Sequence, residues 1–389
     1  MAQRRIKLPG IQDLSKEQED ARALPLEGQH LIIGGPGTGK SVLALLRAKR
    51  LRSENAAYVF LVYNHLLSQS SRQLFGGELV SAQWQSWFLN CFQEFAGEPM
   101  PRFPAKPHSR WKAFNWDAGL EIAANTETSG SADRPYLVID EGQDMPPGFY
   151  QCLANFGFAN FFVVADQNQQ IAPGENSSRR DIENALAVMP SEVIELKMNY
   201  RNKYPTARLA QSFYTGDPAS PPPDLPPASS SQANVPLLYA YPPPAFSAII
   251  GRIAKMADRM PAKLIGIITP DNNVREVYFL ALDKTHPGLE NGNINVSTFK
   301  SGDTHELAFD EGGIMVINAQ SCKGLEFDVV FIAGLHEFKV KHPFVDQAKR
   351  LFYVMVARAI DRVIMLQELG RHCSADAILP ADTKVLERY

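Results

Sequence analysis

Residues 31–41 of the chain read LIIGGPGTGKS and decide the fold of its first half. An apolar run, Leu31–Ile33, passes into a glycine-rich segment that ends in Lys40 and Ser41, and a helical run, Val42–Arg52, follows. A strand, a glycine-rich turn and a helix in this order turn backbone N–H groups toward an anion, which the positive end of the helix also attracts. We therefore predict a phosphate-binding loop at this point.

The loop contains every fixed position of the pattern G-x-x-x-x-G-K-[ST]. Lys40 supplies a positive charge for the β- and γ-phosphates of a nucleotide, and the Ser41 hydroxyl is placed to ligate Mg²⁺. The residues that we expect to bind the nucleotide here are Gly35, Pro36, Gly37, Thr38, Gly39, Lys40 and Ser41.

The composition limits what the chain can be. Its 389 residues predict two or three domains, and its 42 acidic and 39 basic residues leave a net charge of −3. This balance argues against a generally basic nucleic-acid coat but leaves a local basic groove open. The four cysteines are far apart, and no segment reads as a signal peptide or a membrane span. We expect a soluble cytoplasmic protein without a membrane partner.

Two more apolar runs end in polar side chains. Tyr136–Ile139 is followed by Asp140 and Glu141, and Phe161–Ala165 is followed by amides that include Gln169. Adjacent carboxylates after a strand suit a magnesium nucleotide site, in which Asp140 holds Mg²⁺ and Glu141 orients and deprotonates the attacking water. The amides are candidates to bridge the γ-phosphate to a second binding surface.

Strands that end in polar clusters, with helices between them, predict an open parallel sheet whose ligands lie at the carboxyl ends of the strands. A second strand–helix series follows the proline-rich tract 216–236, which we expect to be a surface loop. We predict a helix within 11–23 that opens near Ser15, and further helices over 245–260 and 350–359. The expected strands are Leu31–Ile33, Val59–Tyr63, Leu79–Val80, Tyr136–Ile139, Phe161–Ala165, Val193–Leu196, Leu237–Ala240, Leu264–Ile268, Gly313–Ile317, Val329–Ala333 and Val363–Leu366.

Residues 88–134 leave two interpretations open. Basic side chains alternate there with aromatic ones, as in a groove for single-stranded nucleic acid. The same aromatic residues could instead form the core of a small subdomain. The side chains concerned are Arg102, Phe103, Lys106, His108, Arg110, Trp111, Lys112, Phe114 and Trp116.

A buried arginine is predicted in the second half of the chain. Arg358 follows small and apolar residues, and an unpaired buried guanidinium is costly. A γ-phosphate would satisfy it, which makes Arg358 a candidate arginine finger supplied within the chain.

These motifs, in this order, resemble those of UvrD/Rep-type superfamily 1 DNA helicases. DEGQD at 140–144 matches the DExQD motif of that family, and Lys323–Phe327 matches its KGLEF motif. Further matches are Gln18, Tyr63-Asn64, Ser81–Trp87, Asp166 with Gln169, Tyr200-Arg201, Ile267–Arg275 and Tyr353–Ala359.

The resemblance implies two RecA-like P-loop NTPase domains with parallel sheets flanked by helices. Residues 1–190 would form the first, with an accessory insertion at about 88–134, and residues 191–389 the second, with the proline-rich loop at 216–236. ATP and Mg²⁺ would be bound between the two.

The resemblance also assigns roles to single residues. Gln18 would read adenine, and Gln169 would sense the γ-phosphate. Tyr200 would stack on the base and Arg201 contact phosphate. The second domain would further supply Gly324, Glu326 and the finger Arg358.

The chain departs from the family near the expected nucleic-acid track. Asn318 and Gln320 stand where the family usually has Thr and His, and Ala357 stands where it has Thr. Ala172 and Pro173 replace the aromatic residues expected after the motif that contains Gln169. Strand separation is therefore less secure than ATP hydrolysis.

Two functions follow. The first is an ATP-driven translocase or helicase on single-stranded DNA, with RNA as the lesser option and no small-molecule substrate besides ATP. The second is a nucleic-acid-sensing regulatory ATPase that serves a partner, such as a nuclease in DNA repair or anti-phage defence. The short polar stretch 291–313, where the family places a large insertion, favours the second.

Overall fold

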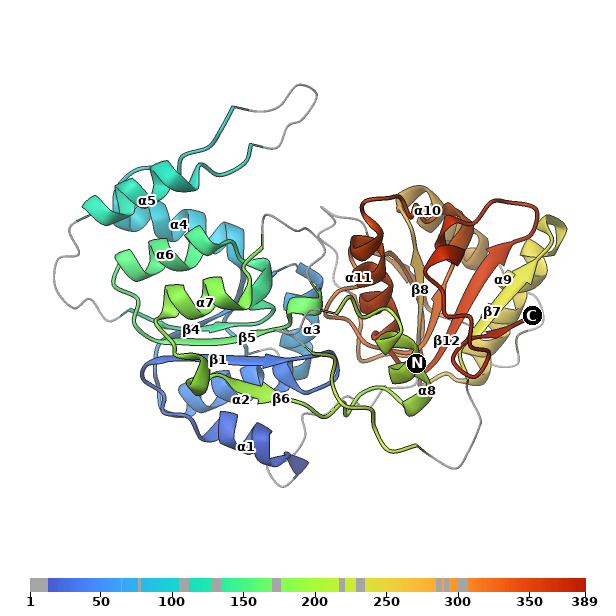
Figure 1. The fold of residues 1–389 in the computed structure, drawn as a ribbon, viewed down its shortest axis with the longest axis horizontal. Helices are drawn as coiled ribbons and strands as arrows, with labels where there is room; N and C mark the ends of the chain where they lie inside the picture. Colours follow the sequence, from blue (N-terminus) through green and yellow to red (C-terminus); the bar gives the residue numbers. More distant parts are fainter. Residues whose placement is uncertain are drawn as a thin grey trace. The chain divides into compact units, whose positions relative to one another are not determined.

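The computed structural model describes residues 13–63, 65–75, 78–104, 112–126, 134–169, 176–216, 221–228, 235–284, 289, 294–299 and 307–389. The chain divides into two compact units (Figure 1). The N-terminal unit contains residues up to Leu196, apart from Gly35–Thr38. The C-terminal unit contains Lys197–Tyr389 together with Gly35–Thr38. Outside the described residues lie Asn64, Gln170, Ala172, Pro173, Lys106, His108, Arg110 and Trp111, together with 291–293 and 300–306 of the polar stretch.

Six strands form the sheet of the N-terminal unit in the order β3-β2-β4-β5-β1-β6, and all neighbouring pairs are parallel. The strands are β1 (Gln29–Gly34), β2 (Tyr58–Val62), β3 (Ser81–Gln83), β4 (Tyr136–Ile139), β5 (Phe161–Ala165) and β6 (Ile194–Leu196). Five of these strands, β1, β2, β4, β5 and β6, overlap the apolar runs from which strands were predicted. The strand expected to begin at Leu79–Val80 is present but starts slightly later, at Ser81, and the Val80 carbonyl already accepts the N–H of Phe60 in β2 at 2.9 Å.

Helices cover both faces of this sheet, so successive strand residues enter different cores. Leu31 and Ile33 pack into one core and Ile32 into the other, as the two-residue period of a strand requires. On one side lie α1 (Lys16–Ala23) and α2 (Lys40–Ser53) (Figure 1). The other side is covered by α4 (Trp84–Ala96), α6 (Pro147–Asn155) and α7 (Arg179–Leu186), while α3 spans His65–Phe75.

The aromatic residues around α4 and α5 (Trp116–Asn125) pack into the core on one face of the N-terminal sheet. The ring of Phe114 lies 5.2 Å from that of Trp116, and Phe88 lies 5.5 Å from Trp116. Arg102 lies over Phe114 at 4.9 Å, whereas Phe103 is exposed. For the described residues the structure therefore favours a core role for Phe114 and Trp116 over a stacking groove, but this core is shared with the sheet and is not that of a separate subdomain.

Seven strands form the sheet of the C-terminal unit in the order β13-β7-β12-β11-β8-β10-β9, again with every pair parallel. The strands are β7 (Leu237–Tyr241), β8 (Leu264–Thr269), β9 (Val296–Thr298), β10 (Gly313–Asn318), β11 (Phe327–Ile332), β12 (Ala359–Glu368) and β13 (Glu387–Arg388). One side carries α9 (Phe246–Arg259) and α10 (Asn272–Asp283), and the other carries α8 (Tyr204–Gln211) and α11 (Val345–Val356) (Figure 1). The predicted fold class, two parallel-sheet α/β units flanked by helices, is confirmed.

Two expectations in the C-terminal unit need correction. The helix expected over 350–359 ends at Val356, so Arg358 lies in the turn before β12. The proline-rich tract is not all surface, because Pro223 is buried. Its backbone carbonyl accepts a hydrogen bond from Gln211 Nε2 at 2.8 Å, and its ring lies where a Cβ on Gly35 would fall.

Candidate nucleotide site

The glycines of the phosphate loop adopt backbone conformations that other residues avoid. Gly37 has φ +78° and Gly39 has φ +90°, and Gly39 caps α2 from the left-handed region. The Thr38 hydroxyl donates to the carbonyl of Gly35 at 2.8 Å. This local fold leads directly into α2, whose first residue is Lys40.

The Lys40 ammonium is buried beside a carboxylate at the end of β5. Its Nζ lies 3.6 Å from Oδ2 of Asp166, and only 6% of the Lys40 residue surface is exposed. Gln169 Nε2 donates to the same oxygen at 2.6 Å. In this arrangement the Asp166 carboxylate fixes the position of the lysine charge.

Asp140 follows β4, is fully buried and has one unsatisfied oxygen. Its Oδ1 accepts the backbone N–H of Glu141 at 3.0 Å, and the neighbouring Ser41 hydroxyl acts to lower the pKa of the Asp140 carboxyl. Its Oδ2 is buried and has no hydrogen-bond partner among the described residues. An orphaned carboxylate oxygen beside a hydroxyl is a donor set that fits Mg²⁺, which takes one or two protein oxygens and otherwise binds substrate phosphates and water.

Burial raises the pKa of Asp140, and the neighbouring Glu141 carboxylate raises it further. Burial also raises the pKa of Asp166, against the opposing effect of Lys40. Both shifts mean that burial disfavours the charged forms of these carboxylates. A bound cation would favour them again.

Glu141 is held in a backbone conformation that is uncommon for a side chain of this type, with φ +57° and ψ +43°. Gln143 Nε2 donates to Glu141 Oε2 at 2.6 Å, and Gln143 Oε1 accepts the backbone N–H of Asp166 at 2.9 Å. Gln143 therefore links the acidic ends of β4 and β5. We did not single out this residue from the sequence, although it lies inside the DEGQD motif.

Gln18 lies against the phosphate loop and also caps its own helix. Its Oε1 accepts the backbone N–H of Ser15 at 3.0 Å, in a capping box that confirms the predicted helix start. Its Nε2 lies 2.4 Å from the position that a Cβ on Gly39 would take. The structure thus brings Gln18, Lys40, Ser41, Asp140, Glu141 and Gln169 together in the N-terminal unit, with neighbours in common.

In the C-terminal unit Arg201 forms an ion pair with Glu326. The backbone N–H of Tyr200 donates to the carbonyl of Gly37 at 2.8 Å, and the Tyr200 side chain is 54% exposed. Asn199 Oδ1 accepts the backbone N–H of Arg201 at 3.1 Å. These contacts place the Tyr200-Arg201 segment against Gly37.

Arg358 is 1% exposed and has protein partners for its guanidinium. Its Nε donates to the carbonyl of Val354 at 3.1 Å, and one terminal nitrogen donates to the carbonyl of Leu325 at 3.5 Å. Asn202 Nδ2 donates to the carbonyls of Ala357 at 3.1 Å and Ala359 at 2.5 Å, on either side of the arginine. The expectation that burial leaves Arg358 unpaired is therefore wrong in part, and the contacts of Asn202 were not predicted from the sequence.

Of the departures from the family, Asn318 has a defined role in the structure. Its Nδ2 donates to Asn272 Oδ1 at 2.9 Å, and its Oδ1 accepts the backbone N–H of Ser321 at 2.9 Å. It therefore joins the end of β10 to the start of α10. Ala357 is fully buried.

The fold and the site define an α/β protein of two parallel-sheet units with a glycine-rich loop at the end of one central strand. Residues 272–368 match the family of UvrD-like helicase C-terminal domains. The resemblance to UvrD-like helicases is thus confirmed for this segment, which lies in the C-terminal unit.

Two solved structures are similar at low identity. The C-terminal domain of a possible DNA helicase from Lactobacillus plantarum WCFS1 has 16% identity and a TM-score of 0.33, over 48% of this chain and 97% of that one. A PRRSV helicase has 12% identity and a TM-score of 0.40, over 94% of this chain and 57% of that one. No curated protein matches the sequence. Within the described residues, no helix is long and apolar enough to cross a membrane.

Proposed function

We propose that this protein hydrolyses ATP with Mg²⁺ and uses the energy to move along single-stranded DNA. The observation that supports this most is the buried cluster of Lys40, Asp140, Glu141 and Asp166, in which one Asp140 oxygen has no partner among the described residues. A buried set of opposite charges with an orphaned oxygen is typical of a site that receives a charged ligand.

Each side chain of the cluster has a chemical role in this proposal. Lys40 holds the β- and γ-phosphates, and Ser41 and Asp140 hold Mg²⁺, which neutralises charge on the phosphate oxygens. Glu141 orients and deprotonates the attacking water, with its orientation fixed by Gln143. Glu141 is suited to this role because its hydrogen bond with Gln143 fixes the carboxylate before the substrate arrives.

The remaining predicted residues belong to the same proposal. Residues 1–190 and 191–389 are the two motor domains, and ATP bridges them. Arg201 leaves Glu326 to contact phosphate, and Arg358 exchanges carbonyl partners for the developing charge of the γ-phosphate. Loss of that phosphate lets the domains part, and repeated closure moves the strand.

Steady-state ATP hydrolysis of Lys40→Ala tests the phosphate loop. We expect turnover to fall to background, because the charge on the β- and γ-phosphates is lost. Lys49→Ala is the matched control, since Lys49 lies on the same helix and is exposed. Equal turnover in Lys40→Ala and Lys49→Ala would show that the loop does not hold the substrate.

Glu141→Gln separates binding from chemistry. Because a general base contributes about 10²- to 10⁴-fold, we expect turnover to fall by that factor while ATP still binds. The exposed Glu121 on α5 gives the control Glu121→Gln. Loss of ATP binding together with turnover would mean that Glu141 acts in the fold and not as the base.

A regulatory ATPase that does not separate strands is the second candidate. It is favoured by Asn318, which replaces a family Thr and is bonded within its own unit. Such a protein would hydrolyse ATP in response to single-stranded DNA, yet displace no strand from a partial duplex, and would act through a nuclease or another DNA repair or defence partner. Strand displacement that depends on Lys40 would exclude it.

A further inference from the structure

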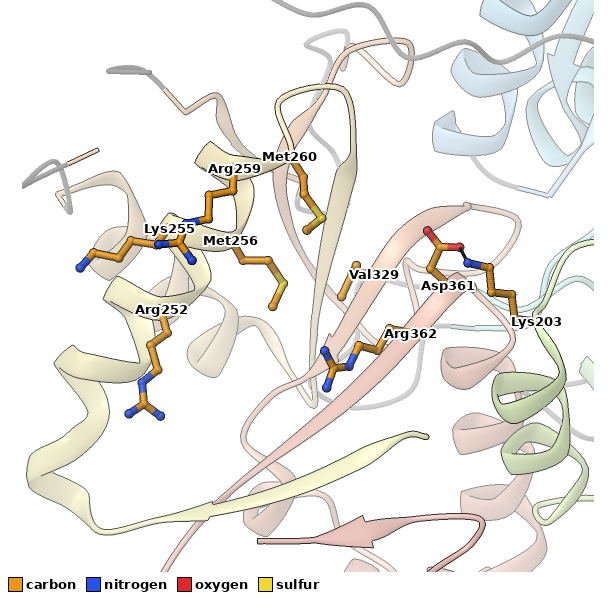
Figure 2. A pocket seen from close by; sticks show the side chains of 9 residues that line it. All are labelled: Lys203, Arg252, Lys255, Met256, Arg259, Met260, Val329, Asp361 and Arg362. Atoms are coloured by element: carbon orange, nitrogen blue, oxygen red, sulfur yellow. Dashed lines mark ion pairs between the residues drawn. The ribbon is translucent and has the colours of Figure 1, made fainter. Parts of the chain in front are cut away.

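A cavity of about 520 Å³ lies in the C-terminal unit, between α9 and the beginnings of β11 and β12 (Figure 2). Its volume is in the range of small-ligand sites. Helix α9 supplies one wall and the two strands supply the other, so the cavity belongs to a single unit. None of its lining residues has a part in the nucleotide site described above.

The lining is strongly cationic. Its basic side chains are Lys203, Arg252, Lys255, Arg259 and Arg362. The one carboxylate, Asp361, is already paired with Lys203 at 2.7 Å and with Lys263 at 3.3 Å. In a chain of net charge −3 this local excess of positive charge is not a consequence of composition. It favours an anionic ligand.

Arg362 lines the cavity from the strand side, opposite the basic residues of α9. Figure 2 shows its side chain extending from β12 toward α9, into the space between them. Its Nε is buried and has no hydrogen-bond partner in the part of the chain that the structure describes. A buried donor without a partner costs about 1 to 3 kcal/mol, so a ligand that supplies an acceptor here is favoured. A guanidinium binds phosphate through two parallel hydrogen bonds.

An apolar wall stands beside the cations. Met256 and Met260 project from α9 into the same space, and Val329 faces them from β11 (Figure 2). Thioethers make favourable contacts with aromatic rings. The ligand that fits both walls carries an anionic group for Arg362 and a flat ring for the methionines.

We propose that this cavity binds a nucleotide unit, with its phosphate ester on Arg362 and its base against Met256 and Met260. A free mononucleotide and a nucleotide of a single strand share this chemistry. The site is separate from the phosphate loop and needs no hydrolysis. It would give the protein a second nucleotide contact within the C-terminal unit.

Methyl NMR of protein labelled at the methionine methyl groups tests the proposal in a Lys40→Ala background, which removes binding at the phosphate loop. The probes are AMP, inorganic phosphate, hexaglutamate and oligo-dT of eight nucleotides. Met256→Leu and Met260→Leu assign the two signals. We expect AMP or oligo-dT to shift both signals and to leave the buried Met145 of the N-terminal unit unchanged. The tighter of these two probes identifies the source of the nucleotide.

Arg362→Gln should weaken the binding of that probe about 10- to 100-fold, as expected for one charge-assisted contact. Arg371→Gln is the control, because Arg371 follows the opposite end of β12 and is exposed. If the free Arg362→Gln spectrum shows misfolding, Arg259→Gln at the rim replaces it. The proposal is overturned if no probe shifts the two signals, if phosphate or hexaglutamate acts as strongly as AMP and oligo-dT, or if the cavity and control variants behave alike. Loss of ATP hydrolysis would not affect this readout.

Discussion

Replacing Asp140 by asparagine should stabilise the protein when nucleotide and Mg²⁺ are absent. Asp140 is fully buried, and burial together with the Glu141 carboxylate raises its pKa from 3.8 to about 6. At pH 7.5 the folded protein must therefore keep a charge in a place that disfavours it. Asparagine has the same shape and can still accept from the Ser41 hydroxyl and the Glu141 N–H.

The expected size follows from the pKa difference. One pKa unit corresponds to about 1.4 kcal/mol, so a shift from 3.8 to about 6 gives an increase of roughly 2 to 3 kcal/mol in the free energy of unfolding. For a unit of this size that is a rise of roughly 5 °C or more in the melting temperature. Exposed substitutions usually change stability by less than about 0.5 kcal/mol.

The pH dependence gives the sign. Because the folded-state pKa is raised, the folded wild type binds more protons than the unfolded chain between the two pKa values, and its stability falls as the pH rises through this window. Asp140→Asn has no carboxyl group at this position, so its stability does not fall in this way as the pH rises. The difference between the two proteins should be full at pH 7.5 and small near pH 4, where Asp140 is protonated in the folded wild type.

Calorimetric melting of wild type, Asp140→Asn and the exposed control Glu121→Gln at both pH values measures the effect. Added Mg²⁺ and ATP should reverse the order at pH 7.5, since the wild type gains a metal ligand that the variant lacks. If the variant melts below the wild type at pH 7.5 without Mg²⁺, the reasoning is refuted. The charged Asp140 side chain would then stabilise the fold through an ion pair by more than its burial destabilises it.

Three further substitutions follow from the contacts of the loop and of Arg358. Gly37→Ala should lose ATP binding, as measured by isothermal titration, because Gly37 has φ +78° and the new Cβ would lie 2.2 Å from Asn199 Oδ1; unchanged affinity would contradict the loop geometry. Asn202→Ala should lower the free energy of unfolding in urea by about 1 to 3 kcal/mol, because it leaves two buried carbonyls without their donor. Arg358→Ala should slow ATP hydrolysis by ~10³-fold or more if the side chain acts as a finger, and near-normal turnover in single-turnover assays would remove that role.

The strands of both sheets could be predicted because central parallel strands are buried on both faces. Runs such as Val329–Ala333 and Phe161–Ala165 are apolar throughout and hence easy to recognise. The edge strands were harder. β3 is partly buried along its whole length and β13 is a pair of residues, so neither has a strong apolar pattern.

The end of α11 shows why some boundaries could not be predicted. No glycine or proline interrupts the apolar sequence between Val354 and Ala359, so local pattern favours a continuing helix. The helix ends because the Asn202 amide takes the carbonyls of Ala357 and Ala359 and because Ala359 pairs with Phe327 in the sheet. Both partners are distant in sequence.

The candidate site divides in the same way. The loop residues and the acidic pair lie in contiguous motifs whose chemistry is local, so they could be proposed as site residues from the sequence alone. Gln143 and Pro223 could not be predicted in the same way. Gln143 contacts Asp166 and Pro223 contacts Gly35, and both contacts form only when segments that are distant in sequence come together in the fold. The cationic cavity is likewise assembled from separate elements.

The most direct test of the central claim is the steady-state rate of ATP hydrolysis at low salt, with and without single-stranded DNA. We predict that DNA raises the rate in the wild type, that it leaves Lys40→Ala at background, and that RNA of the same length stimulates less. An ATPase rate that single-stranded DNA does not change, in protein shown to bind ATP, would contradict the account.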